Sequence, residues 1–430
     1  MKKLLALFVA IATCLSCFGL IGAMAEGNIK ITLQAREDPN GSNAQSQYFI
    51  DKINEFNAAD NGIEVEMVFI STEADYLSRL ATDVASGDCA NVFMEYGGSR
   101  VLDYLQAGLL LDLTPYYEED PEWYNSVYEA MWTPCVFEGY DGIYGCPHAS
   151  YEVVLMYNKA YLDQCGLEVP TTWEELMNCC AVLKENGIQP FLVGENDNYR
   201  FGHLFSNLAI TSYGKETAEK IGAREIGYDS EECKAIYQMI IDAYNAGYFG
   251  DAVLSYGASE ERAYIGAGEC AFTWDLTSRL YWMDGSDEMN AGNLHITHFP
   301  AVNEEYYKWC QGGASQAFYV STQNASEEEI AASVELLKYI TGKEFIGGLM
   351  DATNSTFAIR GESTNTERCY IYDEIDELVG DTAGVVTELQ NFDSEAAAIT
   401  IVRNALSTIV QGASADDIAT QIVNEFEDLE

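Results

Sequence analysis

The alternation of apolar and polar positions near the start of the chain predicts strands and helices in turn. Residues 29–33 alternate apolar and polar side chains, as in a strand with one buried face. Apolar side chains recur at helical spacing over residues 49–56, and residues 63–70 have the pattern of a second strand. A second amphipathic helix covers residues 76–84, and residues 92–94 form a short apolar strand. This β-α-β-α-β order predicts an α/β fold with a parallel, doubly wound sheet.

Farther along the chain the pattern favours helices. A helix is predicted to begin at Trp173, where a preceding threonine can cap the first turn. Another helix spans residues 231–244, a short strand is predicted at residues 271–274, and the C-terminal part is mainly helical. Ligands of doubly wound sheets bind beyond the carboxyl ends of the strands, so residues 36–43 and 95–99 are candidate ligand loops.

The first residues have the pattern of an export signal. Two lysines precede an uncharged apolar stretch over residues 4–21, and small residues at the end of this segment suit cleavage after Ala25. The signal is therefore predicted to cover residues 1–25. Lipid anchoring through Cys17 and an uncleaved membrane anchor are the alternatives. Beyond the signal, no stretch approaches the ~18 apolar residues that a membrane helix needs.

The charge balance excludes several classes of partner. The chain has 430 residues, with 22 Lys and Arg against 69 Asp and Glu, and a net charge of −47. Nucleic acid and anionic membrane surfaces repel such a chain, so neither is expected as a partner. Apolar residues make up 48% of the chain, which is too high a share for a disordered protein. The length suits about three domains of ordinary size, or two lobes of about 200 residues.

Cysteine usage does not require disulfides. Of the 12 cysteines, Cys14 and Cys17 lie in the predicted signal, which leaves ten. A chain of this length can build its core without covalent links, so free and buried cysteines are expected. If one disulfide forms, Cys135 and Cys146 are the pair that we would test first.

The motifs of catalysis and metal binding are absent from the sequence. It contains no H-E-x-x-H, no G-x-S-x-G and no G-x-x-x-x-G-K-[ST] segment. His295 and His298 are three residues apart on a predicted strand and therefore point to opposite faces. We predict no catalytic residue, no metal and no cofactor, so the protein is not expected to be an enzyme. A secreted hydrolase with paired carboxylates is the alternative, because 69 acidic residues offer many pairs.

Tyrosine is unusually frequent, with 28 Tyr against 18 Phe and 6 Trp. A ring with a polar tip suits a site that must be apolar and hydrated at once. A sugar makes that demand, because its flat C–H faces stack on aromatic rings and its hydroxyls need donors and acceptors. The composition therefore favours carbohydrate as a ligand, although most of these rings belong to the core.

Four segments of the chain carry a family resemblance. In chain order they are residues 86–93 (SGDCANVF), 107–115 (AGLLLDLTP), 142–159 (GIYGCP, then LMYNK) and 166–176 (GLxxPxTWEEL). Their order and spacing resemble those of extracellular solute-binding proteins of ABC importers, in the sugar-binding branch that includes maltose-binding protein. Ala90 and Asn91 depart from the usual Pro and Asp of the first segment.

The resemblance implies two doubly wound α/β lobes that are joined by crossing strands and close on a ligand by hinge motion. The N-terminal lobe is expected to comprise residues 26–148 and 296–328. The C-terminal lobe is expected to comprise residues 149–295 and 329–430.

The resemblance also implies a set of ligand contacts. The implied residues are Arg36, Glu37, Glu95, Tyr96, Tyr151, Tyr199, Arg200, Trp274, Asp275, Gln311, Gly312 and Gly313. Trp274 is expected to stack on the sugar, so Trp274→Ala is expected to weaken binding with little loss of stability. If Arg36 and Arg200 both line the site, the ligand is expected to carry a carboxylate, which arginine binds bidentately. Pairing of these arginines with acidic residues of the chain is the alternative.

The function that the resemblance implies is binding without turnover. The protein is expected to bind a carbohydrate between its lobes, outside the cell, and to deliver it as a monomer to the permease subunits of an ABC importer. The alternatives are a secreted carbohydrate-active hydrolase, a binding protein for a non-sugar ligand such as a polyamine, and a ligand-sensing receptor partner with the same fold.

Overall fold

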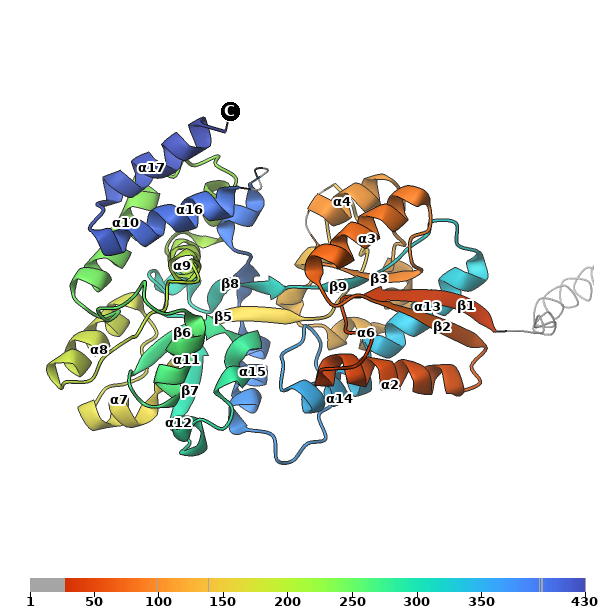
Figure 1. Cartoon of the computed structure of the whole chain (residues 1–430), viewed down its shortest axis with the longest axis horizontal. Helices are drawn as coiled ribbons and strands as arrows, with labels where there is room; N and C mark the ends of the chain where they lie inside the picture. Colours follow the sequence, from red (N-terminus) through yellow and green to blue (C-terminus); the bar gives the residue numbers. More distant parts are fainter. Residues whose placement is uncertain (1–27, 98, 138, 394, 396, 430) are drawn as a thin grey trace, which may run out of the picture. The chain divides into compact units, whose positions relative to one another are not determined.

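The computed structural model of the protein describes residues 28–97, 99–137, 139–393, 395 and 397–429 (Figure 1). The predicted export signal and Cys17 lie outside the described residues. The chain forms two compact units. Unit 1 comprises the residues up to Phe93 and Val320–Leu337, and unit 2 comprises Met94–Tyr319 and Lys338–Glu430. The lobe boundaries implied by the resemblance stay a prediction.

Unit 1 is built on a parallel sheet. Its elements are β1 (Ile29–Ala35), α2 (Ala44–Ala58), β2 (Ile63–Phe69), α3 (Glu73–Ser86), the start of β3 (Val92–Glu95) and most of α13 (Glu327–Ile340). β1 pairs in parallel with β2, where Ile31 lies opposite Val65, and with β3, where Leu33 lies opposite Val92. The predicted β-α-β-α-β order and its parallel sheet are confirmed.

Local sequence signals set the ends of the helices in unit 1. The Thr72 side chain accepts a hydrogen bond from the backbone N–H of Asp75 at the start of α3, and the Asn43 side chain accepts one from Ser46 in α2. Gly87 ends α3 in the left-handed conformation, with φ of 85°. The caps therefore determine where each helix meets the loop that leads to the next strand.

Unit 2 contains the second sheet, in the order β10-β8-β5-β6, with β7 paired to β5. The strands of this unit are β4 (Cys146–Pro147), β5 (Ser150–Asn158), β6 (Phe272–Leu276), β7 (Leu294–His298), β8 (Trp309–Ala314), most of β9 (Ala317–Val320) and β10 (Gly384–Val386). β5, the long yellow strand in Figure 1, pairs antiparallel with β8 at its start and with β6 and β7 farther along. β10 pairs in parallel with β8. The α/β class is confirmed, and the sheet of unit 2 is mixed because β5 runs against its neighbours.

The helices of unit 2 follow the strands in sequence. They are α4 (Ser99–Gln106), α5 (Thr114–Glu119), α6 (Pro121–Ser126), α7 (Lys159–Cys165), α8 (Trp173–Glu185), α9 (Arg200–Gly222), α10 (Glu231–Asn245), α11 (Ala258–Gly266), α12 (Asp287–Asn290), α14 (Lys343–Thr353), α15 (Tyr370–Asp381), α16 (Ala398–Ser407) and α17 (Ala415–Glu427). The 3₁₀ helices are η1 (Glu129–Met131), η2 (Thr133–Cys135), η3 (Thr277–Met283), η4 (Glu304–Tyr306), η5 (Leu389–Phe392) and η6 (Thr408–Gln411). The predicted start at Trp173 is confirmed, since Thr172 caps α8 in a capping box with Glu175.

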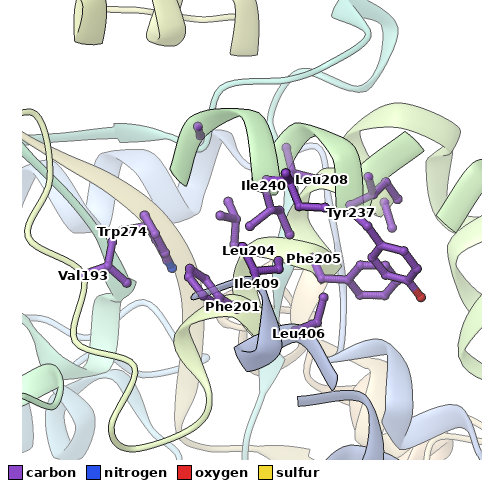
Figure 2. Close-up of a cluster of buried hydrophobic side chains, with 14 of the residues drawn as sticks. Val193, Phe201, Leu204, Phe205, Leu208, Tyr237, Ile240, Trp274, Leu406 and Ile409 are labelled. Carbon is purple, nitrogen blue, oxygen red and sulfur yellow. The ribbon is translucent and has the colours of Figure 1, made fainter. Parts of the chain in front are cut away.

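The core of unit 2 gathers apolar side chains from β5, β6, α8, α9, α10, α16 and α17 (Figure 2). Figure 2 shows Phe201, Leu204 and Phe205 of α9 inside this cluster. Residues 200–211 of α9 are buried at every position, as expected for a helix that is surrounded by other elements. This burial holds the start of α9 firmly in place, and Arg200, one of the predicted ligand residues, lies there.

The ten cysteines of the described residues are all free. Cys135 and Cys146 are both buried and carry no disulfide, and burial raises the pKa of the Cys146 thiol to about 11. The expectation of free cysteines is therefore confirmed. Among the described helices, none combines the length and the apolar character needed to cross a membrane.

Candidate functional site

Most of the predicted ligand residues of unit 2 lie on neighbouring elements. These are Tyr151 on β5, Gln311, Gly312 and Gly313 on β8, Trp274 and Asp275 on β6, Arg200 at the start of α9 and Tyr199 just before it. In the sheet, Tyr151 lies opposite Gly313, and Leu155 lies opposite Trp274. α9 packs against β8. The tertiary structure thus gathers these residues on one sheet and on the helix that packs against it.

Gly312 of β8 allows a close approach to β5, and Gly313 adopts a backbone conformation with positive φ. A Cβ atom at Gly312 would lie 2.8 Å from the backbone oxygen of Tyr151, and Gly313 has φ of 140°. The Tyr151 hydroxyl is 3.4 Å from the Thr387 hydroxyl, and Gln311 is buried in the same strand as the glycines. Strand pairing therefore gives these glycines a structural reason that the sequence did not indicate.

Arg200 is the centre of a buried charge network. Its side chain is 1% exposed, and its guanidinium donates to the two carboxylate oxygens of Glu261, at 3.0 Å and 2.6 Å. It also donates to the hydroxyl of Thr273 and to the backbone oxygen of Trp274, and it lies 3.5 Å from Asp275. Burial opposes the charge of Arg200, but the two carboxylates outweigh it and raise the pKa of Arg200. The guanidinium is directed at partners within unit 2, which is the expected alternative of pairing with acidic residues of the chain.

Arg262 extends this network to two aromatic side chains. Its guanidinium donates to both carboxylate oxygens of Asp275, with 3.1 Å between Nη2 and Oδ1, and Nη2 lies 3.4 Å from the Tyr199 hydroxyl. The guanidinium carbon is 5.8 Å from the ring centroid of Trp282, which is within the range of a cation–π contact. Asp275 is thus shared by two arginines, and one of them connects it to the exposed part of the site.

A second ion pair also contacts Tyr199. Arg403 donates to both carboxylate oxygens of Glu388, at 2.8 Å and 2.5 Å, and its guanidinium carbon is 6.0 Å from the Tyr199 ring centroid. The His203 ring centroid is 4.9 Å from that of Tyr199. Burial, helped by the nearby arginines, lowers the pKa of His203 well below 6.5, so this imidazole is neutral at physiological pH. The charges around Tyr199 are therefore those of ion pairs internal to the protein.

Two exposed aromatic rings follow β6 directly. Thr277, Leu280 and Met283 form the buried side of η3, while Tyr281 is 37% exposed and Trp282 is 53% exposed. The ring centroids of these two aromatics are 5.8 Å apart. Trp282 was not among the residues predicted from the sequence, although its place directly after a predicted strand is a signal, because η3 begins where β6 ends.

Trp274 has a packing role. Its side chain is buried, at 1% exposed, and its ring centroid lies 5.4 Å from that of Phe191 and 5.6 Å from that of Phe249. Its indole N–H donates to the backbone oxygen of Arg200 at 3.2 Å. Figure 2 shows the ring beside Val193 in the core. The expectation that Trp274→Ala leaves stability intact is therefore wrong, because the ring belongs to the core.

The remaining predicted residues form local contacts. Glu95 is buried and its carboxylate accepts a hydrogen bond from the backbone N–H of Tyr96 at 2.8 Å. In unit 1, Arg36 pairs with Glu73 at 3.0 Å. Glu37 is buried and accepts hydrogen bonds from two side chains of α2, and burial raises its pKa. The part of these residues in ligand binding stays a prediction.

The charge network of Arg200 and Arg262, together with the exposed ring of Trp282, offers both polar and apolar contacts. Asp275 and Glu388 are carboxylates whose positions are fixed by arginines, and Tyr151 and Tyr199 add hydroxyls. Trp282 adds a flat apolar face. A hollow of about 450 Å³ in unit 2 is lined by other residues, in the segment 284–292 and at 369–370. Through Arg262, the exposed aromatic face of Trp282 is therefore connected to the Tyr199 hydroxyl and the Asp275 carboxylate.

Comparison with known proteins establishes the family and the fold. The chain matches the family of bacterial extracellular solute-binding proteins over residues 40–345, and no curated protein matches it. A family 1 extracellular solute-binding protein from Bifidobacterium longum subsp. infantis is 19% identical, with a TM-score of 0.74 over 94% of this chain and 100% of that one. RafE from Streptococcus pneumoniae in its apo form is 17% identical, with a TM-score of 0.69 over 93% and 98%.

A further solved structure, described as a chitin oligosaccharide binding protein, is 19% identical, with a TM-score of 0.70 over 93% of this chain and 98% of that one. At these identities the solved structures show that the fold is shared and nothing beyond it. The family match spans most of the chain and both units. The protein therefore belongs to the bacterial extracellular solute-binding proteins.

Proposed function

We propose that the protein is the substrate-binding component of an ABC importer, which binds a carbohydrate outside the cell and delivers it to membrane permease subunits. Family membership supports the solute-binding role. Structures with the same fold include RafE in complex with raffinose and the chitin oligosaccharide binding protein. For this chain, the observation that carries the proposal is the exposed ring of Trp282, supported by Arg262.

The physical reason lies in the two kinds of surface that a sugar presents. A pyranose ring stacks its C–H face on an indole, while its hydroxyls need hydrogen-bond partners that are already oriented. Arg262 is held by Asp275 and lies against the Trp282 ring, so the indole is supported from within the protein. Because the support of the ring is fixed in this way, little conformational entropy is lost when a sugar stacks on it.

Trp282→Ala is expected to weaken carbohydrate binding at least tenfold, which corresponds to about 1.4 kcal/mol. The reason is the loss of the stacking face, since the half-exposed ring contributes little to the core. The measurement is isothermal titration calorimetry on the chain expressed without the predicted signal. Raffinose, chitotriose and xylotriose are the first ligands, and a thermal-shift screen of other mono- and oligosaccharides identifies further ones.

Phe392→Ala is the matched control for this substitution. Phe392 is 37% exposed, and it lies near Gly222 at the end of α9 opposite to Tyr199. This variant should bind like the original protein. If Trp282→Ala retains full affinity for every sugar that binds, the indole has no part in the site. If no saccharide binds, the carbohydrate assignment itself is wrong.

The alternatives to transport make different predictions. A hydrolase would convert a bound oligosaccharide into shorter products, which chromatography of an overnight incubation detects. A polyamine-binding protein would show stabilisation by spermidine or putrescine and none by sugars. We propose binding without turnover, because Glu261, Asp275 and Glu388 are all engaged by arginines and none is poised as a pair around a substrate bond.

We propose two alternative forms of the exported protein. The family is extracellular, and one solved structure of the same fold is described as a probable secreted solute-binding lipoprotein from Streptomyces coelicolor. Cleavage after Ala25 gives a soluble exported protein, and lipidation of Cys17 gives an anchored one. Mass spectrometry of the mature N-terminus distinguishes the two.

A further inference from the structure

Arg279 differs from the other arginines of the chain. It is exposed, and among the arginine side chains that the structure describes it alone has no ion pair, hydrogen bond or ring contact. The others pair with carboxylates or, in the case of Arg360, donate to backbone oxygens. In a chain with 69 acidic and 22 basic residues, a guanidinium with no carboxylate partner is conspicuous. Its donors are available to a ligand.

The spacing of η3 places Arg279 and Trp282 on the same side of the helix. A 3₁₀ helix has three residues per turn, so side chains three positions apart lie one above the other. The buried residues Thr277, Leu280 and Met283 follow this spacing. Arg279 and Trp282 are also three positions apart, and they therefore share one of the outward sides of the helix.

The position of η3 is held from two directions. On its buried side, the Thr277 hydroxyl accepts a hydrogen bond from the backbone N–H of Glu152 in β5 at 3.1 Å. On its exposed side, Arg262 lies against the Trp282 ring while its own guanidinium is held by Asp275. The pair formed by Arg279 and Trp282 is thus attached to the sheet.

We propose that Arg279 and Trp282 form a single saccharide subsite, in which the indole stacks on a pyranose ring and the guanidinium donates hydrogen bonds to oxygen atoms of the same sugar. This inference rests on the proposed carbohydrate-binding function. It names Arg279 as the residue that recognises the oxygen atoms of the sugar. Hydroxyl and carboxylate oxygens share the required acceptor chemistry. A carboxylate adds charge and the two-point geometry that the planar guanidinium matches.

The inner arginines explain why the outer one has this role. Arg200, Arg262 and Arg403 each use their donors on Glu261, Asp275 or Glu388. An incoming sugar oxygen would have to displace a charged partner to reach the guanidinium nitrogens that these carboxylates hold. Arg279 has no such partner, so a hydrogen bond to the sugar costs it only its contacts with water.

The test is calorimetry with raffinose, chitotriose, xylotriose and trigalacturonic acid on the original chain and on three variants. Arg279→Gln is expected to weaken the best-bound saccharide at least tenfold with an unchanged Tm, because no internal partner is lost. Arg279→Lys should recover part of the affinity, because it keeps the charge and loses the planar fork. Lys215→Gln is the control, since it removes an exposed cation of α9 that pairs with Glu219, and it should leave binding unchanged.

The double variant Arg279→Gln with Trp282→Ala tests whether the two side chains hold one sugar. Its loss of affinity should be smaller than the product of the two single losses. A loss confined to trigalacturonic acid identifies a carboxylate as the acceptor, and a loss with the neutral sugars identifies hydroxyls. Full affinity in Arg279→Gln, or losses that multiply as independent effects, overturns the shared subsite while carbohydrate binding stands. Absence of binding to every saccharide overturns both proposals.

Discussion

At the scale of single residues, burial separates two tryptophans that are close in sequence. Trp274 is 1% exposed and packs against Phe191 and Phe249, whereas Trp282 is 53% exposed on η3. The difference in exposure arises where β6 ends. The strand directs Trp274 into the core, and the 3₁₀ helix after it leaves Trp282 exposed. Their roles in stability and in binding should therefore be opposite.

Trp274→Ala is expected to destabilise the fold by about 3–5 kcal/mol, the usual cost of removing a large core aromatic. The substitution leaves a cavity beside Phe191 and also frees the backbone oxygen of Arg200. Urea unfolding followed by far-UV circular dichroism measures the loss. Trp282→Ala is the comparison, with an expected change within about 0.5 kcal/mol. Similar small changes in both variants would contradict the assignment of Trp274 to the core.

At the scale of elements, short polar signals decide where helices begin. Thr172 accepts a hydrogen bond from the backbone N–H of Glu175, and the Glu175 carboxylate accepts one in return from the backbone N–H of Thr172. The donor groups of the first turn have no partners within the helix, so these bonds satisfy donors that otherwise depend on water. The same principle applies at Thr72 in α3 and at Ser414 in α17.

Thr172→Ala is expected to destabilise the protein by about 1 kcal/mol, because it removes the N-cap of α8. Thr171→Ala is the matched control, since the Thr171 hydroxyl only donates to the exposed Glu175 carboxylate and the cap itself remains. Chemical denaturation of both variants gives the difference in the free energy of unfolding. If the two substitutions cost the same, the cap does not contribute as the geometry indicates.

At the scale of the whole molecule, the net negative charge and the buried carboxylates both destabilise the folded state when the acidic groups are ionised. The net charge of −47 makes the folded chain repel itself. Burial raises the pKa of Glu152 and of Glu195 to about 7, against an ordinary value of 4.5. Glu152 accepts a hydrogen bond from the Thr382 hydroxyl at 2.7 Å, and Glu195 accepts one from the backbone N–H of Phe201 at 3.0 Å. Ionising either group inside the fold is unfavourable.

Stability is therefore expected to fall as the pH rises from about 4.5 to about 7. Over this window the folded state holds protons on the two glutamates that the unfolded state has released, so the free energy of unfolding decreases with pH. Glu152→Gln removes one of these two titrating groups. It should be more stable than the original protein at pH 8, by at most about 3 kcal/mol, and similar to it near pH 4.5.

Thermal unfolding of the original chain and of Glu152→Gln between pH 4.5 and pH 8 tests this dependence. Glu344→Gln, which changes an exposed glutamate of α14, should keep the original profile. A profile of Glu152→Gln that runs parallel to the original one would show that Glu152 does not take up its proton in this range.

The parts of the fold that were predicted depend on neighbours in sequence. The β-α-β-α-β order and the start of α8 at Trp173 follow from apolar spacing and from caps within a few residues. The parts that were missed depend on residues far apart in the chain. Arg200 meets Glu261 and Asp275 across a separation of 61 and 75 residues, and no local pattern indicates that pairing.

The sequence by itself determined the α/β class, the parallel order of unit 1, the family and the acidic charge, because spacing, caps and composition are local or additive properties. Only the tertiary structure decided that Arg200 is neutralised within unit 2, that Trp274 belongs to the core, and that Arg279 and Trp282 share an exposed side of η3. The physical reason is that burial and charge pairing depend on which elements pack together, so two tryptophans serve opposite roles in β6 and in the short helix that follows it.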